Sequence, residues 1–91
     1  MSLRLYYLPT CKSCHIAIQT FEAYAIDAQR RGLPISFEKI DARSVPKGSL
    51  YAQYGIYDVP ALVFVRIDGT SQSYPKGIKD YTLQTYQILF G

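Results

Sequence analysis

Apolar and polar positions follow two different periods along the chain, and the changes of period divide it into elements. Residues 3–8 form a short apolar run, which is typical of a buried strand. From residue 14, apolar residues recur every three or four positions, which predicts an amphipathic helix that ends at Gly32. Residues 35–42 alternate as in a strand, and residues 59–65 are almost entirely apolar, as in a central strand covered on both faces.

Shorter elements complete the pattern. Residues 44–55 predict a second helix with Pro46 in its first turn, where proline is tolerated. Asp68-Gly69 is a strong hairpin signal, so residues 70–74 are expected to return as an antiparallel edge strand. The apolar spacing over residues 79–91 predicts a last helix.

The order of these elements, β-α-β-α-β-β-α, predicts an α/β fold. A strand, a helix and a strand imply two parallel strands joined by a right-handed crossover. Adding a hairpin and a helix gives a four-stranded mixed sheet flanked by three helices. The chain of 91 residues is expected to form a single domain, 1–91, and a monomer.

Composition excludes several functional classes. Hydrophobic residues make up 48% of the chain and charged residues 19%, as in globular proteins. The net charge of +3 is mild and the basic residues are scattered, so nucleic-acid binding is not expected. No stretch approaches the ~20 apolar residues that span a bilayer, and the N-terminus does not resemble a signal peptide. We therefore expect a cytoplasmic protein without a membrane partner.

The chain's two cysteines stand at positions i and i+3 where the first helix is expected to begin, in Cys11-Lys12-Ser13-Cys14. Thr10 is a plausible helix cap. The positive end of a helix favours a thiolate, which is the attacking species in thiol–disulfide exchange. We therefore predict that Cys11 attacks a disulfide and Cys14 resolves the product, with Lys12 lowering the pKa of Cys11.

Other interpretations of the pair are weaker. Zinc requires four ligands, and the chain has two cysteines and one histidine. Cys11 to His15 also matches the pattern of c-type haem attachment. Haem iron usually takes a second axial ligand, however, and the chain has only one His, His15, and only one Met, Met1. A Cys-His hydrolase would need a third orienting group. His15 is interpreted as a partly exposed helix residue that could also tune the nucleophile, and no metal or cofactor is expected.

Cys11-Lys12-Ser13-Cys14 after the first strand, with Val59-Pro60 before the third, resembles the thioredoxin/glutaredoxin superfamily over nearly the whole chain. The resemblance implies that Pro60 is cis and lies against the cysteine pair. It also implies that the main chain of Val59 pairs with an extended substrate, as an added strand would. Together with Thr10 and Lys12, Val59 and Pro60 are the expected substrate-binding residues.

The chain also departs from the pattern of the superfamily that it resembles. Thr10 stands where thioredoxin has Trp, Lys12-Ser13 replaces Gly-Pro, and Leu5 takes the approximate place of a buried Asp. Asp58 precedes Val59-Pro60 where glutaredoxin has Thr, and it would repel the carboxylate of glutathione.

The expected function is that of a protein-disulfide oxidoreductase. Its partners would be disulfide-containing proteins and a donor of the thioredoxin-reductase type or glutathione. The alternatives are a glutathione-dependent reductase of the glutaredoxin type and a redox-inactive binding module with the same fold.

Overall fold

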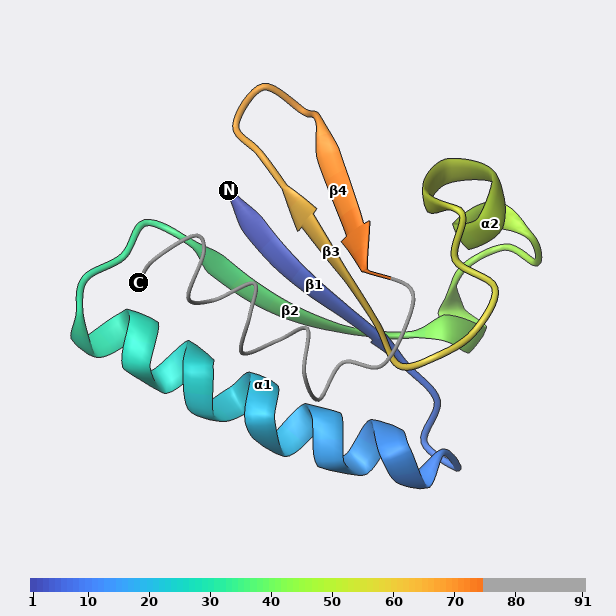
Figure 1. The fold of residues 1–91 in the computed structure, drawn as a ribbon, viewed down its shortest axis with the longest axis horizontal. Helices are drawn as coiled ribbons and strands as arrows, with labels where there is room; N and C mark the ends of the chain where they lie inside the picture. Colours follow the sequence, from blue (N-terminus) through green and yellow to red (C-terminus); the bar gives the residue numbers. More distant parts are fainter. Residues whose placement is uncertain (75–91) are drawn as a thin grey trace.

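Four strands lie side by side in one mixed sheet of order β2-β1-β3-β4 (Figure 1). The structure is a computed structural model that describes residues 1–74, so the helix expected over residues 79–91 lies outside the described residues. The elements are β1 (Ser2–Tyr7), α1 (Lys12–Arg30), β2 (Ser36–Asp41), the 3-10 helix η1 (Ala42–Ser44), α2 (Ser49–Tyr54), β3 (Ala61–Val65) and β4 (Ser71–Tyr74).

The strand pairing agrees with the predicted topology. β1 pairs with β2 in parallel, and α1 makes the crossover between them. β1 and β4 both pair antiparallel with β3, which therefore lies inside the sheet. Residues 61–64 of β3 are all buried, as the apolar run predicts for a central strand. The hairpin at Asp68-Gly69 is also confirmed, because Arg66 N donates to Thr70 O at 2.8 Å.

The apolar core has one part on each face of the sheet. On the α1 side, Ala17 and Phe21 of the helix pack on Leu3 and Leu5 of β1, with Leu62 and Phe64 from β3. On the other side, Ile56 packs with Tyr6, Ala61 and Val63. Alternate residues of β1 and β3 point to opposite faces, so each strand supplies both parts.

Two predicted helix starts are wrong. The N-cap of α1 is Cys11 rather than Thr10, because the Cys11 sulfur accepts from the amide of Cys14. The second helix begins at Ser49 rather than Ser44. The Asp41 carboxylate accepts from Arg43 N and supports a separate turn at η1. Gly48 then turns the chain into α2 with a left-handed φ of 81°, which glycine adopts without a steric penalty.

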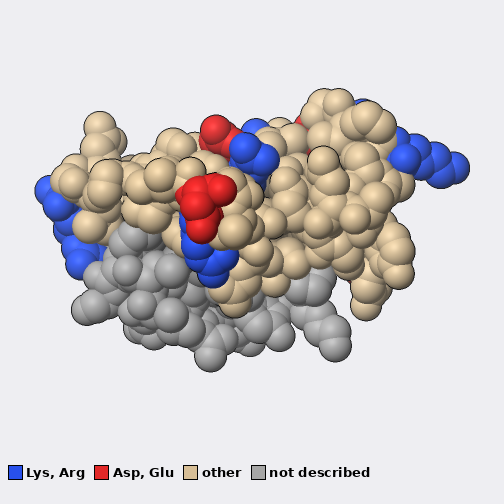
Figure 2. Space-filling model, turned by 90° about the horizontal axis from the view of Figure 1, so that it is seen from above, with Lys and Arg blue, Asp and Glu red and all other residues tan. Residues whose placement is uncertain are grey.

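Charged side chains stand at separate places on the face seen in Figure 2, and acidic groups lie beside basic ones near its middle. Two ion pairs link β2 to its surroundings: Glu38 with Arg4 and Lys39 with Glu22. Between residues 1 and 74, no helix is both long enough and apolar enough to cross a membrane.

Candidate functional site: a cysteine pair near a cis-proline

The cysteine pair begins α1 directly after the turn that leaves β1. The Cys11 amide closes this turn by donating to Leu8 O at 3.1 Å. The Cys14 amide donates to the Cys11 sulfur at 3.2 Å, which satisfies one of the free N–H groups at the helix start. Both cysteines are free thiols; Cys11 is partly exposed, whereas Cys14 is completely buried.

The surroundings of the two thiols push their pKa values in opposite directions. Partial burial opposes ionisation of Cys11, but hydrogen bonds from Cys14 and Ser13 outweigh it and lower the pKa of Cys11. Burial, followed by the hydrogen bond to Cys11, raises the pKa of Cys14 to about 11. The negative charge of Asp58 adds to this increase in the pKa of Cys14. The partly exposed sulfur is therefore the better thiolate, and the buried one keeps its proton at neutral pH.

Lys12 is not among the leading causes of this lowered pKa, although the sequence suggested that role. It lies exposed beside Cys11, as does Thr10. Ser13, which the sequence reasoning passed over, supplies the neighbouring hydroxyl, 3.2 Å from the Cys11 sulfur. Its position two residues after Cys11 could have indicated this contact, because serine commonly bonds to near neighbours.

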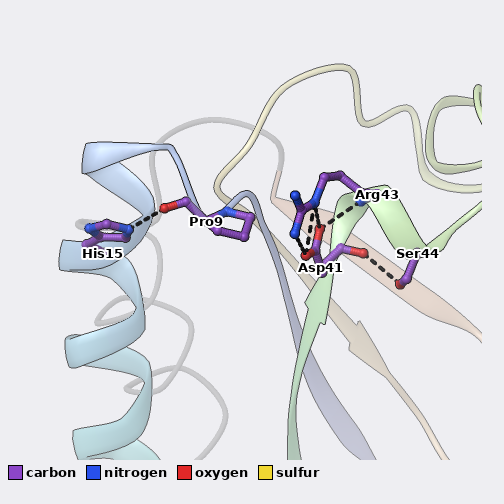
Figure 3. Close-up of polar contacts among 5 residues, drawn as sticks. All are labelled: Pro9, His15, Asp41, Arg43 and Ser44. Atoms are coloured by element: carbon purple, nitrogen blue, oxygen red, sulfur yellow. Dashed lines mark hydrogen bonds and ion pairs between the residues drawn. The ribbon is translucent and has the colours of Figure 1, made fainter.

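His15 holds the segment that precedes Cys11. Its ring Nε2–H donates to the carbonyl of Pro9 at 2.7 Å (Figure 3). Its main-chain N–H donates to Cys11 O at 3.3 Å. The ring is exposed, as predicted. His15 thus ties the first turn of α1 to the residues that precede Cys11.

The sheet register brings the Val59-Pro60 segment to the same end of the molecule. Tyr6 of β1 pairs with Ala61, the first residue of β3. The segment that enters β3 and the turn that leaves β1 therefore lie at one sheet end, where Figure 1 also places the start of α1. The Val59–Pro60 peptide bond is cis, as the resemblance implied, and Pro60 is buried. The electrostatic effect of Asp58 on Cys14 agrees with this proximity.

The main-chain donor expected to bind substrate already has a partner. Val59 N donates to its neighbour's carboxylate, Asp58 Oδ1, at 2.8 Å. Leu5 is fully buried among apolar residues, so the first strand offers no carboxylate beneath the pair at this position. Within residues 1–74, no three His, Cys, Asp or Glu side chains gather closely enough to hold a metal ion.

No protein-family model and no curated protein sequence matches this chain. Solved structures do match. The germline-specific thioredoxin Deadhead of Drosophila melanogaster superposes with a TM-score of 0.73 at 19% identity, covering 99% of this chain and 80% of that one. Fasciola hepatica thioredoxin gives 0.72 at 19% identity, with the same coverage.

A bacterial structure extends the likeness to a chain of similar length. Thioredoxin 1 of Thermosipho africanus superposes with a TM-score of 0.62 at 17% identity, covering 98% of this chain and 97% of that one. At these identities the likeness is one of fold. The chain therefore has a thioredoxin-like fold, with its cysteine pair at the start of the first helix.

Proposed function

We propose that the protein is a thiol–disulfide oxidoreductase that reduces protein disulfides through Cys11 and Cys14. The observation that carries the proposal is the asymmetry of the two thiols. Cys11 is partly exposed and has a lowered pKa, whereas Cys14 is buried within hydrogen-bonding reach and has a raised one. Nucleophilic attack requires an accessible thiolate, and resolution requires a second thiol held close to it.

The reaction runs in two exchanges. The Cys11 thiolate attacks one sulfur of the substrate disulfide, which forms a mixed disulfide and releases the other substrate sulfur as a thiolate. Cys14 then loses its proton and attacks the Cys11 sulfur, which forms the Cys11–Cys14 disulfide and releases the second substrate thiolate. The substrate gains two electrons, one proton from Cys14 and one proton from water, and an external dithiol or thiol must reduce the protein again.

The raised pKa of Cys14 favours the order in which the two thiols react, with Cys11 first. A protonated Cys14 does not compete with Cys11 for the substrate, and it becomes a nucleophile only when a base takes its proton. The departing substrate thiolate can accept that proton. A donor of the thioredoxin-reductase type is preferred to glutathione, because the exposed Asp58 carboxylate would repel the anionic tripeptide. The proposed place of action is the cytoplasm, where thiols are kept reduced.

Insulin reduction with dithiothreitol as the donor tests this assignment. Cys11→Ser should lower the rate to that of dithiothreitol alone, because serine is not a nucleophile toward sulfur at neutral pH. In the absence of dithiothreitol, reduced Cys14→Ser should accumulate a covalent adduct with insulin through Cys11, visible by mass spectrometry and released when dithiothreitol is added. Ser13→Thr is the matched control, because it changes the same turn but keeps both thiols and a hydroxyl. Full activity of Cys11→Ser would overturn the proposal.

A further inference from the structure

The turn that joins β1 to α1 contacts both cysteines. It runs over residues 8–11, and the Cys11 amide closes it by donating to Leu8 O at 3.1 Å. The Leu8 main chain also hydrogen-bonds to Cys14 and lowers the pKa of that thiol. A shift of this turn against the first turn of α1 would therefore change the surroundings of both sulfurs.

The two central residues of the turn, Pro9 and Thr10, restrict its form. Proline is favoured at this first central position in both type I and type II turns. The two types differ in the orientation of the peptide between the central residues, and type II needs a positive φ at the second of them. Between residues 1 and 74, no residue other than glycine has a positive φ, so the turn is of type I and the Pro9 carbonyl has the orientation of that type.

The His15 side chain holds this carbonyl from outside the turn. Its Nε2–H donates to Pro9 O at 2.7 Å, at the short end of the range for N–H···O bonds (Figure 3). Its main-chain N–H donates to Cys11 O at 3.3 Å. One residue thus bonds to a carbonyl before the helix and to the carbonyl of its N-cap. The turn and the helix cannot move apart without breaking one of these bonds.

The contribution of His15 comes through position rather than charge. His15 is not among the leading causes of the shifted pKa of either thiol. The acceptor is a carbonyl, so the Nε2 atom has to carry a proton, and both the neutral ring and the imidazolium can meet this requirement. The contact therefore does not depend on the charge of the ring.

The Cys11 thiolate depends on the position of this turn. As the N-cap of α1, the Cys11 sulfur accepts from the Cys14 amide at 3.2 Å, and the Ser13 hydroxyl lies at the same distance from it. These contacts lower the pKa of Cys11, and they are made with an extended Cys11 backbone at φ −90° and ψ 117°. A loose turn would let this backbone leave the N-cap conformation, and the sulfur would lose its donors.

We propose that His15 is a positioning residue of the oxidoreductase, whose bond to Pro9 O holds the turn before Cys11 and keeps the attacking sulfur at the donors of the helix start. The proposal rests on the function proposed above. His15 acts through the main chain and contacts no substrate in this role. What position 15 requires is an N–H donor that reaches Pro9 O, whichever side chain carries it.

Glutamine and asparagine at position 15 separate the reach of the donor from its chemistry. The Nε2 atoms of histidine and glutamine are separated from Cβ by the same number of bonds, whereas the amide nitrogen of asparagine lies one bond closer. His15→Gln should therefore keep the bond to Pro9 O, and His15→Asn should lose it. Gln19→Asn is the matched control, because it exchanges the same two amides at an exposed position of α1 one turn later.

Alkylation of Cys11 by iodoacetamide over a range of pH measures its thiolate fraction without turnover. In His15→Asn this fraction at pH 7 should fall about threefold, as expected for the loss of one exposed hydrogen bond, and the Cys11 amide should exchange its hydrogen faster. His15→Gln and Gln19→Asn should both match the unchanged protein. The proposal is overturned if His15→Asn keeps its thiolate fraction, or if either of the other two variants loses as much.

NMR of the unchanged protein tests the contact itself. The neutral His15 ring should carry its proton on Nε2, because only that tautomer can donate to Pro9 O from this nitrogen. A proton on Nδ1 would overturn the proposal whatever the variants show.

Insulin reduction separates this inference from the proposed function. If the unchanged protein does not reduce insulin, the oxidoreductase assignment fails, whereas the thiolate fractions still decide whether His15 holds the turn. If insulin is reduced and His15→Asn keeps its thiolate fraction, the role of His15 alone is overturned.

Discussion

The two faces of the sheet differ in how completely they are closed. On one face, the 19 residues of α1 place Cys14, Ala17, Phe21 and Ala28 in buried positions. On the other, the six residues of α2 include no buried side chain, and a cavity remains beside them. Within residues 1–74, the face under α1 therefore encloses Cys14 in the apolar core, whereas the face beside α2 keeps a cavity.

The largest effect expected from this comparison concerns stability. Phe21 is fully buried and packs edge-on against Phe37, so Phe21→Ala should lower the free energy of unfolding by about 3–5 kcal/mol. Leu50 is only partly buried and lines the cavity, so Leu50→Ala should cost about 1–2 kcal/mol. Urea unfolding measures both values. A similar decrease in the free energy of unfolding for both variants would contradict the view that the α1 face is more tightly packed than the α2 face.

The second prediction compares the two thiols during alkylation by iodoacetamide. The pKa of Cys11 lies below its usual value, so its reaction should rise with pH and reach half its maximum below the ordinary thiol value of about 8.5. The pKa of Cys14 is about 11, and the side chain is buried, so Cys14 should remain unmodified at pH 8. Mass spectrometry of digested samples measures each site, and urea-unfolded protein provides the reference in which both cysteines react.

The smallest effect concerns the Ser13 hydroxyl beside the Cys11 sulfur. Ser13→Ala removes a hydrogen bond that favours the Cys11 thiolate, so the pKa of Cys11 should rise and the reduced form should become less stable. A loss of about 1 kcal/mol in this partly exposed bond corresponds to a potential more negative by roughly 20 mV. Ser13→Thr keeps a hydroxyl at this position and should therefore have the redox potential of the unchanged protein. A titration in glutathione buffers would contradict the role of Ser13 if the potential of Ser13→Ala did not change.

The strands and the first helix could be predicted because local patterns determine them. The apolar runs at residues 3–8 and 59–65 and the three-to-four spacing after Cys14 each identify their element to within a few residues. The starts of the helices were less predictable, because each depends on which side-chain atom accepts a hydrogen bond from the free amides of the first turn. Thr10 is a common capping residue, but the Cys11 sulfur is the atom that meets the amide of Cys14.

The candidate site was predictable only in part, for a similar reason. The position of the cysteine pair at the start of α1 was predictable from sequence spacing alone. The neighbours that tune them depend on the register between β1 and β3, which brings Asp58 within electrostatic reach of Cys14 across more than forty residues of sequence. Neither this proximity nor the cavity between η1 and α2 has a local signal in the sequence.

The N-cap made by Cys11 has a consequence for the protein as a whole. The sulfur that would surrender electrons to a substrate is also the acceptor that completes the first turn of α1. A thiolate is a stronger acceptor than a sulfur bound in a disulfide, so oxidation weakens the start of the helix while reduction strengthens it. The stability of the first turn and the redox potential of the pair are therefore linked through the Cys11 sulfur. A change that stabilises the first turn when Cys11 is a thiolate also stabilises the reduced form relative to the disulfide.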